Sequence, residues 1–511
     1  MFKTLFIGIT TILAFVSLGL TAYFKSDYTN WNTNTKSFMS GIEVERIFYK
    51  LDNILYTILG MVIIGVIIYT IIKLCKKFKI SNKLLVGIGI LFSITLCSLI
   101  VFKLNVKPRA DQIQVLNGAI NSIKGDFSSF DKSQYFGWYP FQIGIVFYVE
   151  MLLRVFKSES YILIQSINIL LLAITYIYMY KCIDKIVKKD IAKKISIIFM
   201  FLFIPVYPYV TFVYGNIPGL MFGIISIYYM LNYFDNKKIY NLILSAITIA
   251  IAINLKNNYL IFFIAEAIVY FVYSIKNRDY KLIAVILFAF ILNKGMYKSV
   301  EKYYEIRGNM ELSKGIPKNA WMVMAMQEGN MAPGWFNGYS VNVYSRNDYD
   351  NAKTTKAANE DLKDCIKNFI SNPIYAFKFY TRKSISQWSE PTFESTWIIQ
   401  PWIENEYYER VANSKFLDSI FKGKLRKIYD VYCESLLILI YSLSVIGIIR
   451  NFKNIDIKSS IFIIIFLGGF AFHLLWEGKS QYTWIYILCA IPYCGLAFNE
   501  LKKRQLRLNG K

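Results

Sequence analysis

Long apolar stretches recur along almost the whole chain, and they restrict its possible folds more than any other feature. The chain has 511 residues, 55% of them hydrophobic, and a mean hydropathy of +0.38. Backbone groups in lipid must find their hydrogen bonds within the segment, so such runs cross as helices. The sequence therefore predicts an all-α polytopic membrane protein with about 12 transmembrane helices. We expect spans at 2–24, 54–73, 84–103, 160–182, 195–214, 216–233, 240–255, 259–274, 282–296, 430–449, 459–477 and 482–498.

Lysine and arginine concentrate in the short segments between these runs. They number 58 against 34 acidic residues, which gives a formal net charge of +24. Positive residues collect in the cytoplasmic loops of membrane proteins, so this excess does not indicate nucleic-acid binding. The same rule predicts a multi-pass protein of the cell membrane with both termini in the cytoplasm. It assigns to that side the segments 73–83, 184–194, 235–238, 275–281, 450–458 and 501–511.

Two apolar segments need a separate decision. The first run, 2–24, has one lysine before its apolar stretch, as a signal peptide does, but it is long and lacks a clear small-x-small cleavage site, so we expect a retained span. Residues 138–156 would invert every later basic loop if they crossed the membrane. They also carry Glu150 and Arg154, a favourable i,i+4 pair that would be costly at mid-bilayer. We interpret 138–156 as an amphipathic helix in the outer interface.

This topology divides the chain into four parts. They are an N-terminal accessory transmembrane hairpin (1–83), a transmembrane core (84–296) with an acidic first outer loop (104–159), a small extracytoplasmic mixed domain (297–429), and three C-terminal helices with a basic cytoplasmic tail (430–511).

Polar residues on the predicted outer face gather in a few places. The loop after the third span holds Asp111, Asp126 and Asp131. Three short outer turns, 214–219, 254–259 and 476–484, join later spans. Asp126 and Asp131 lie beside a glycine and a serine-rich stretch and have the character of solvated cap residues, whereas Asp111 follows the span closely. We therefore favour Asp111 as the reactive carboxylate over the other two.

Cysteine and histidine give no support for a metal centre. The seven cysteines form no CxxC pair, and His473 is the only histidine. We expect no cofactor, and a divalent metal is possible but not favoured, because residues 110–112 read Ala-Asp-Gln and offer no second acid beside Asp111.

The order of these features resembles the GT-C superfamily of membrane glycosyltransferases, which includes the protein O-mannosyltransferases and the lipid A aminoarabinose transferases. The likeness is greatest to a Gram-positive bacterial branch, and in architecture it covers residues 84–498. It is carried by PRADQIQVLNGA (108–119), GWYPFQIG (137–144), YGNIPG (214–219), LKNNYLIFFIA (255–265), GWFNGYS (334–340) and WEGKSQYTW (476–484).

The resemblance implies a sugar donor linked to polyprenyl phosphate and an acceptor at the cell surface, which is a glycopolymer, a glycolipid or a protein. Asp111 would act as the catalytic base, because the acceptor hydroxyl must lose its proton as the new bond forms. Cations near the membrane surface would stabilise the leaving phosphate. The substrate-binding residues predicted on this basis are Arg109, Tyr139, Gln142, Tyr214, Asn216, Lys256, Trp335, Asn337, Glu477, Lys479, Gln481 and Tyr482.

Two other functions remain open from the sequence. A flippase for lipid-linked glycans would need ionisable residues within its spans, and Glu266 and His473 are the chief examples here. A polysaccharide polymerase or ligase would also have a large outer segment, but such a site more typically uses arginine and histidine, and the chain has one histidine.

Overall fold

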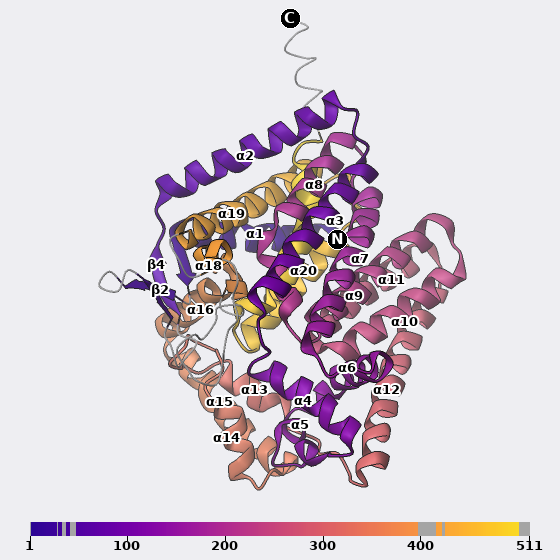
Figure 1. Ribbon diagram of the computed structural model, residues 1–511, viewed down its shortest axis with the longest axis vertical. Coiled ribbons are helices and arrows are strands. Elements are labelled where there is room, and N and C mark those ends of the chain that lie inside the picture. The colour runs from indigo at the N-terminus through magenta and orange to yellow at the C-terminus, as the bar shows by residue number, and fades with distance from the viewer. Residues whose placement is uncertain are drawn as a thin grey trace, which may run out of the picture.

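The computed structural model describes residues 2–27, 29–32, 37–40, 47–396, 415–421 and 425–499, and helices dominate this part of the chain (Figure 1). The basic tail 501–511 lies outside the described residues. Seven helices are long and apolar enough to cross a membrane: α2 (Ile54–Lys77), α3 with its π-helical end (Asn82–Leu104), α7 (Tyr161–Ile186), α9 (Asn216–Asn236), η5 with α11 (Asn257–Asn277), α12 (Lys281–Gly308) and α19 (Arg426–Asn451).

Of the other five predicted spans, three coincide with apolar helices of 17, 15 and 13 residues, one with a bent pair, and one with the 22-residue helix at the N-terminus. The segment 195–214 is a pair bent by 46°, because Pro205 and Pro208 turn the chain from an α-helix into a 3₁₀ helix. By length and composition there are seven spans, or up to nine if each bent pair is one span. The elements concerned are α1 (Phe2–Tyr23), α8 (Asp190–Leu202) with η4 (Ile204–Thr211), α10 (Ile239–Leu255), α20 (Ile461–Leu475) and α21 (Trp484–Leu496).

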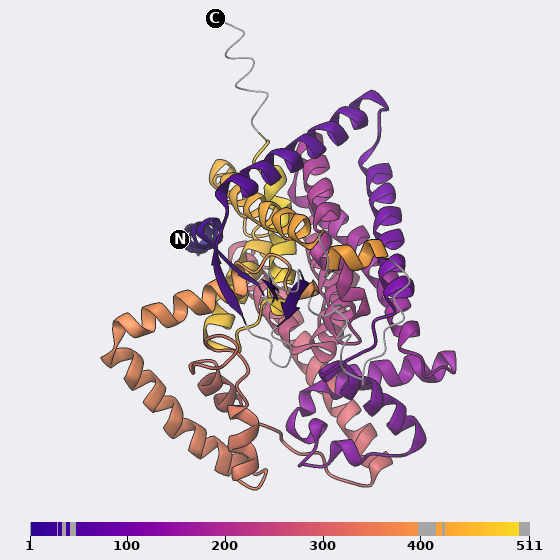
Figure 2. The same ribbon diagram turned by 60° about the vertical axis from the view of Figure 1, so that its left-hand side comes forward.

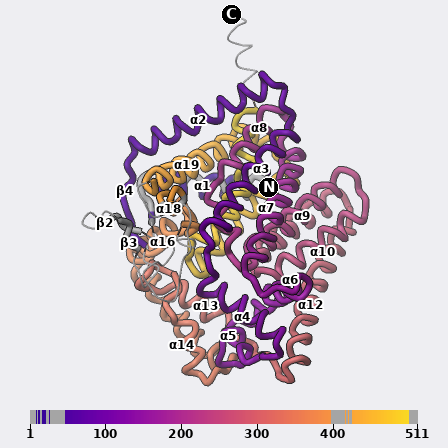
Figure 3. The backbone as a smooth tube through the Cα atoms, in the orientation of Figure 1, coloured from indigo at the N-terminus to yellow at the C-terminus, as the bar shows by residue number. Residues whose placement is uncertain are grey.

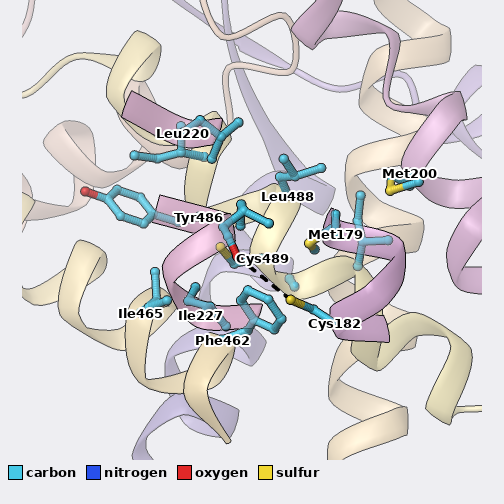
Figure 4. Close-up of a cluster of buried hydrophobic side chains, with 14 of the residues drawn as sticks. Met179, Cys182, Met200, Leu220, Ile227, Phe462, Ile465, Tyr486, Leu488 and Cys489 are labelled. Carbon is cyan, nitrogen blue, oxygen red and sulfur yellow. Dashed lines mark hydrogen bonds between the residues drawn. The ribbon is translucent and has the colours of Figure 1, made fainter. Parts of the chain in front are cut away.

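Helix α21 lies at the centre of the hydrophobic core. Every residue from Trp484 to Leu496 is buried, although the helix has only 13 residues. Figure 4 shows Tyr486, Leu488 and Cys489 of α21 among side chains of α7, α8, α9 and α20. This short helix is therefore enclosed by protein, whereas α2 leaves most of its surface exposed.

The N-terminal helices pack against the C-terminal part of the chain. Helix α2 runs along α19 (Figure 3), and the Ser435 hydroxyl donates a 3.0 Å hydrogen bond to the carbonyl oxygen of Thr57. A Cβ at Gly60 would overlap the Ser435 side chain, so glycine permits this close approach. Helix α2 is thus joined in space to α19 near the C-terminus, not only to the core that follows it in sequence.

The prediction of a mixed domain at 297–429 is wrong. In the described part of that segment every regular element is a helix: the end of α12, α13 (Lys318–Met324), α14 (Tyr339–Arg346), α15 (Asn351–Ser371), α16 (Pro373–Trp388), α18 (Lys415–Phe421) and the start of α19. The strands instead lie in the loop between α1 and α2, where β1 (Phe24–Asp27) pairs antiparallel with β4 (Phe48–Leu51), and β2 (Thr29–Asn32) with β3 (Ser37–Ser40). Among the aromatic residues of 297–396, Trp335, Tyr344, Phe379 and Trp388 are buried.

The basic loops lie beside one another at one end of the helices. Asn82 Nδ2 donates a 2.8 Å hydrogen bond to Asp190, which links the first two loops. The Lys185 ammonium forms an ion pair with Asp235 at an N–O distance of 2.6 Å, and the Lys237 ammonium forms one with Asp279 at 3.2 Å. The loop at 450–458 joins them through Lys458, whose ammonium lies 5.9 Å from the Phe234 ring centre. In Figure 1 the α2–α3 turn is at the top, while α4 (Asp111–Lys124), α5 (Tyr135–Trp138) and α14 are at the bottom.

Segment 138–156 turns sharply. The helical stretches Ser128–Trp138 and Pro140–Phe156 meet at 102°, and α6 (Ile143–Phe156) has 14 residues, fewer than the ~20 that a crossing helix needs. The 3₁₀ turn η2 (Ser128–Phe130) precedes α5, and the 3₁₀ turn η3 (Pro140–Gln142) lies between α5 and α6. Its position in the outer interface stays a prediction.

A buried carboxylate ties α6 to α12 and α4. Glu150 is completely buried and accepts hydrogen bonds from Arg154, Arg307, Tyr303 and Tyr304 at 2.5 to 2.9 Å. Arg307 also donates a hydrogen bond to the backbone carbonyl oxygen of Ser122 in the last turn of α4. The i,i+4 pair of Glu150 and Arg154 is therefore present, but the carboxylate faces α12 instead of water.

Candidate functional site

Asp111 lies just beyond the end of a membrane helix. A π-helical turn, Ile100–Leu104, closes α3, and Asp111 is the first residue of α4, where its charge interacts favourably with the helix dipole. The preceding Ala110 has φ 48° and ψ −128°, a conformation that costs on the order of 1–3 kcal/mol for a residue with a Cβ. Asp111 is exposed. The backbone is therefore strained at Ala110, directly before the exposed carboxylate of Asp111.

Four tyrosines surround Asp111 closely enough for its negative charge to raise their pKa values, although burial raises them more. They are Tyr135, Tyr139, Tyr214 and Tyr482. They come from α5, the residue after it, the loop before α9, and the 3₁₀ turn η6 (Ser480–Tyr482). Three regions that are distant in sequence therefore meet at one carboxylate.

Tyr135 lies near Asp111 and was not predicted. Burial raises the pKa of Tyr135, the nearby Asp111 carboxylate raises it further, and the Tyr135 hydroxyl accepts a 2.8 Å hydrogen bond from Nε2 of Gln142. The side-chain oxygen of Gln142, Oε1, is buried without a hydrogen-bond partner in the described part of the chain. Tyr135 precedes the GWYPFQIG motif by two residues, so its place beside a motif was the only signal in the sequence.

Lys256 lies between α10 and α11 in a turn that is held by close backbone packing. A Cβ at Gly215 would overlap the carbonyl oxygen of Leu255, and a Cβ at Gly144 would overlap that of Asn254. Only glycine fits at either position. The glycines of YGNIPG and GWYPFQIG therefore bring two other segments against the turn that carries Lys256.

The surroundings of Lys256 include two aromatic rings and two carboxylates. Its ammonium lies 4.4 Å from the ring centre of Tyr214 and 5.4 Å from that of Tyr482. Burial lowers the pKa of Lys256 to about 7, although the charges of Asp111 and Glu477 act in the opposite direction. Lys256 therefore changes its charge near neutral pH.

The turn between α20 and α21 supplies a second carboxylate, Glu477, which is 8% exposed. The Tyr482 hydroxyl donates to its Oε2 at 3.5 Å, and the Tyr482 ring stacks on His473 with 5.6 Å between ring centres. The charge of Glu477 also acts on Lys256 and Tyr139. The predicted residues Asp111, Lys256, Tyr139, Tyr214, Glu477 and Tyr482 thus lie in one cluster, which we call the acidic–lysine cluster.

A buried lysine that the sequence analysis missed holds this turn. Lys383 donates to the carbonyl oxygens of Ala325, Leu474 and Trp476 at 2.8, 3.0 and 2.8 Å, which satisfies the end of α20. Burial lowers its pKa to about 7. Gly334, at φ 71°, leaves the space that the side chain fills. No local pattern in the sequence marks a lysine of α16 as a partner of α20.

Two buried glutamates after α16 were also missed. Glu394 Oε2 lies 3.7 Å from the ammonium of Lys479, and Glu390 accepts hydrogen bonds from the Ser480 hydroxyl and the Glu394 amide at 3.0 and 2.6 Å. Phe393 and Glu394 both have positive φ values, 52° and 60°. The only sign of these two residues in the sequence was the spacing of Glu390 and Glu394, four residues apart in SEPTFES (389–395). Lys479 therefore forms an ion pair with Glu394, and its charge also acts on Lys256 of the acidic–lysine cluster.

The remaining predicted residues lie in other surroundings. Trp335 is 1% exposed, its Nε1 donates to the Ser386 hydroxyl at 3.0 Å, and Gly478 packs against its ring. The Asn337 side chain donates a 3.0 Å hydrogen bond to Oε1 of Gln327 and accepts one from the backbone amide of Tyr339, the first residue of α14. Trp335 thus contacts the turn of Glu477, whereas Asn337 stabilises the outer helices.

Asn216 and Gln481 are buried, and Arg109 is half-buried. The carbonyl oxygen of Asn216 accepts a 2.6 Å bond from Tyr259, while its side-chain oxygen has no hydrogen-bond partner among the described residues. The roles of Asn216, Gln481 and Arg109 in substrate binding stay predictions.

Asp126 and Asp131 differ from Asp111 in their local structure. Each accepts a 2.9 Å hydrogen bond from the backbone amide two residues later, at Ser128 and Ser133, and this bond lowers its pKa. Both are exposed turn-forming residues. Within the described ranges, no group of three or more His, Cys, Asp or Glu residues is placed to hold a metal ion.

Comparison with known proteins gives a distant likeness only. No protein-family model and no curated protein matches the chain. Two solved structures of the oligosaccharyltransferase of Archaeoglobus fulgidus are similar to it. One, of AglB with an inhibitory peptide and a dolichol-phosphate, has 12% identity and a TM-score of 0.44. The other, in the apo form, has 11% identity and a TM-score of 0.45. Each match covers 84% of this chain and 52% of the archaeal chain, so the chain spans about half the length of those structures.

Proposed function

We propose that the chain is an integral membrane glycosyltransferase. It moves a sugar from a polyprenyl-phosphate donor to a glycopolymer, glycolipid or protein acceptor at the outer face of the cell membrane. The observation that carries the proposal is the acidic–lysine cluster, in which an exposed carboxylate and a lysine share one tyrosine-lined site. This site lies at the end of the helices opposite the basic loops.

The sidedness rests on charge. In our proposal the chain crosses the membrane twelve times, with the α8–η4 pair, α1, α10, α20 and α21 added to the seven long helices, and both termini are cytoplasmic. Five basic loops contact one another in series through Asp190, Asp235, Asp279 and the Phe234 ring. Positive residues remain on the cytoplasmic side during insertion, so the opposite end, with Asp111, faces outward.

The chemistry assigned to the cluster is a single displacement. The acceptor oxygen forms a bond to the anomeric carbon as the bond from that carbon to the lipid phosphate oxygen breaks, and the phosphate leaves with the electron pair. Asp111 takes the proton of the acceptor hydroxyl. Lys256 stabilises the negative charge on the phosphate. The hydroxyls of Tyr135, beside Asp111, and of Tyr482, which donates to Glu477, can form hydrogen bonds with sugar hydroxyls.

One observation keeps a flippase as a second candidate. Glu266 is buried between α9, α10 and α11 and accepts from the Ser226 hydroxyl at 2.9 Å, while its other oxygen has no hydrogen-bond partner among the described residues. An ionisable residue inside a membrane segment is typical of a transport path. The three helices are unbroken around it, however, and Asp111 lies outside this group.

A transfer assay separates these functions. Sealed vesicles containing the chain receive a prenyl-phosphate-linked radioactive hexose and a cell-envelope acceptor fraction. A transferase moves label to the acceptor with release of lipid phosphate. A flippase moves the donor across the bilayer and leaves the sugar–phosphate bond intact. A polymerase or ligase transfers preassembled glycan chains in preference to a single sugar. Transport without transfer contradicts the proposal.

The pKa of Lys256 predicts how donor binding depends on pH. A lysine with a pKa of about 7 is charged below pH 7 and becomes neutral above it, so its attraction for phosphate falls as pH rises from about 6 to 8. We expect the KM for the donor to rise over this range. Lys256→Arg keeps its charge and should flatten the profile, because the arginine pKa exceeds about 12. Equal slopes in both proteins would exclude Lys256 as the phosphate ligand.

A further inference from the structure

Helices α15 and α16 form a hairpin that projects from the rest of the chain (Figure 2). Between residues 310 and 396 few large hydrophobic side chains are exposed, and most of them lie at the tip of this hairpin. The exposed ones are Phe336 at 37%, Ile366 at 43%, Ile370 at 76%, Ile374 at 72% and Phe377 at 73%. A tip of this kind is costly to leave in water and indicates a surface that something covers.

The tip combines its apolar face with positive charge. Ile366 and Ile370 are one turn apart on α15, and Ile374 follows across a short connection on α16. Lys363, Lys367 and Lys378 are exposed on the same stretch, with Asp364 as its one acidic residue. Apolar residues flanked by lysines are typical of segments that lie in the headgroup region of a membrane.

The base of the hairpin is fixed at the end of a membrane helix. Ile385 accepts a 3.0 Å hydrogen bond from Ser26, and the Ser389 hydroxyl lies 3.0 Å from that of Thr21 in α1. Lys383 bonds the last carbonyl groups of α20. From Ile385 to Ile374 the helix rises about 16 Å. The tip can therefore reach the headgroup region beside these helices.

We propose that the α15–α16 tip inserts into the adjacent membrane surface, with Ile370, Ile374 and Phe377 among the lipids and the three lysines on anionic phospholipid headgroups. The occupant follows from the charge pattern and from the continuity of the hairpin with α1 and α20. A tip held in the bilayer would fix the outer helices relative to the membrane. This contact with the membrane would form whether or not the chain transfers sugar.

Depth-dependent quenching tests this contact in the full chain. Cys365 is half-buried and is replaced by serine, and the other six cysteines are buried, so they do not interfere with labelling. Single cysteines at 374 and, separately, 377 carry an NBD probe in nanodiscs of phosphatidylcholine and phosphatidylglycerol. Lys356→Cys, exposed on α15 about 21 Å from position 370 along the helix, is the matched control.

We expect the NBD emission at positions 374 and 377 to be blue-shifted. Lipids with a doxyl group near the headgroup should reduce the NBD fluorescence at these positions about twofold and leave that at position 356 unchanged. Replacing Lys363, Lys367 and Lys378 with glutamine should reduce this quenching in nanodiscs with phosphatidylglycerol. Probes at 374 and 377 that remain water-exposed, or that are shielded without quenching by lipid, would overturn the proposal and point to a protein partner.

Discussion

Replacing Asp111 with asparagine is expected to lower sugar transfer by about 10²- to 10⁴-fold, the range typical of losing a general base. Asparagine has nearly the same shape, so the donor still binds, but it cannot take the proton of the acceptor hydroxyl. The fold should survive, because Asp111 is exposed at the first position of α4 and its helix-dipole interaction is worth about 0.3–1 kcal/mol. Initial rates with a prenyl-phosphate sugar measure the effect.

Asp126→Asn is the matched control, since Asp126 is also exposed and lies on the same loop, but it bonds the Ser128 amide. It should retain near wild-type transfer. Transfer at wild-type rate by the Asp111 variant, or an equal loss in both variants, contradicts the assignment of the base.

Removing the carboxylate of Glu150 should cause the largest loss of stability. Glu150→Ala leaves Arg307 and the buried Tyr304 hydroxyl without their shared acceptor, and breaking a buried ion pair costs about 3–5 kcal/mol. We expect α6 and α4 to loosen from α12. Thermal unfolding in detergent, followed by the fluorescence of a cysteine-reactive dye, measures the change through the buried cysteines.

Arg154→Ala tests whether the effect belongs to the buried network. The Arg154 side chain is 38% exposed, and without it Glu150 still bonds Arg307. Its loss should cost at most about 1 kcal/mol. If both variants lose the same stability, or Glu150→Ala loses less than Arg154→Ala, then the network does not hold α6 to α12.

The positions of the membrane helices were predictable because lipid leaves an apolar run little choice but to form a helix. The predicted span 84–103 corresponds to Asn82–Leu104, and 430–449 to Arg426–Asn451. The span 282–296 was predicted too short, because α12 continues to Gly308. Its last turns carry Tyr303 and Arg307, whose bonds to Glu150 keep the helix intact beyond the apolar run, and hydropathy does not report such bonds.

The candidate site was predictable where a motif has a steric reason. Gly144 and Gly215 have to be glycine for two segments to meet at the turn of Lys256. Tyr135, Lys383 and Glu394 were missed because their partners are distant in sequence, and only packing brings them together. The strands of the loop between α1 and α2 were missed for a similar reason, since each has four residues and pairs only with another short strand.

Cysteine accessibility in intact cells tests the central claim, that the Asp111 end of the helices faces away from the cytoplasm. With Cys365 replaced by serine, single cysteines are placed at Asp126, on the Asp111 loop, and at Lys79, in the first basic loop; both positions are exposed. A membrane-impermeant maleimide should label position 126 at once and position 79 only after permeabilisation. Labelling of position 79 from outside, with position 126 protected until the cells are opened, would contradict the account.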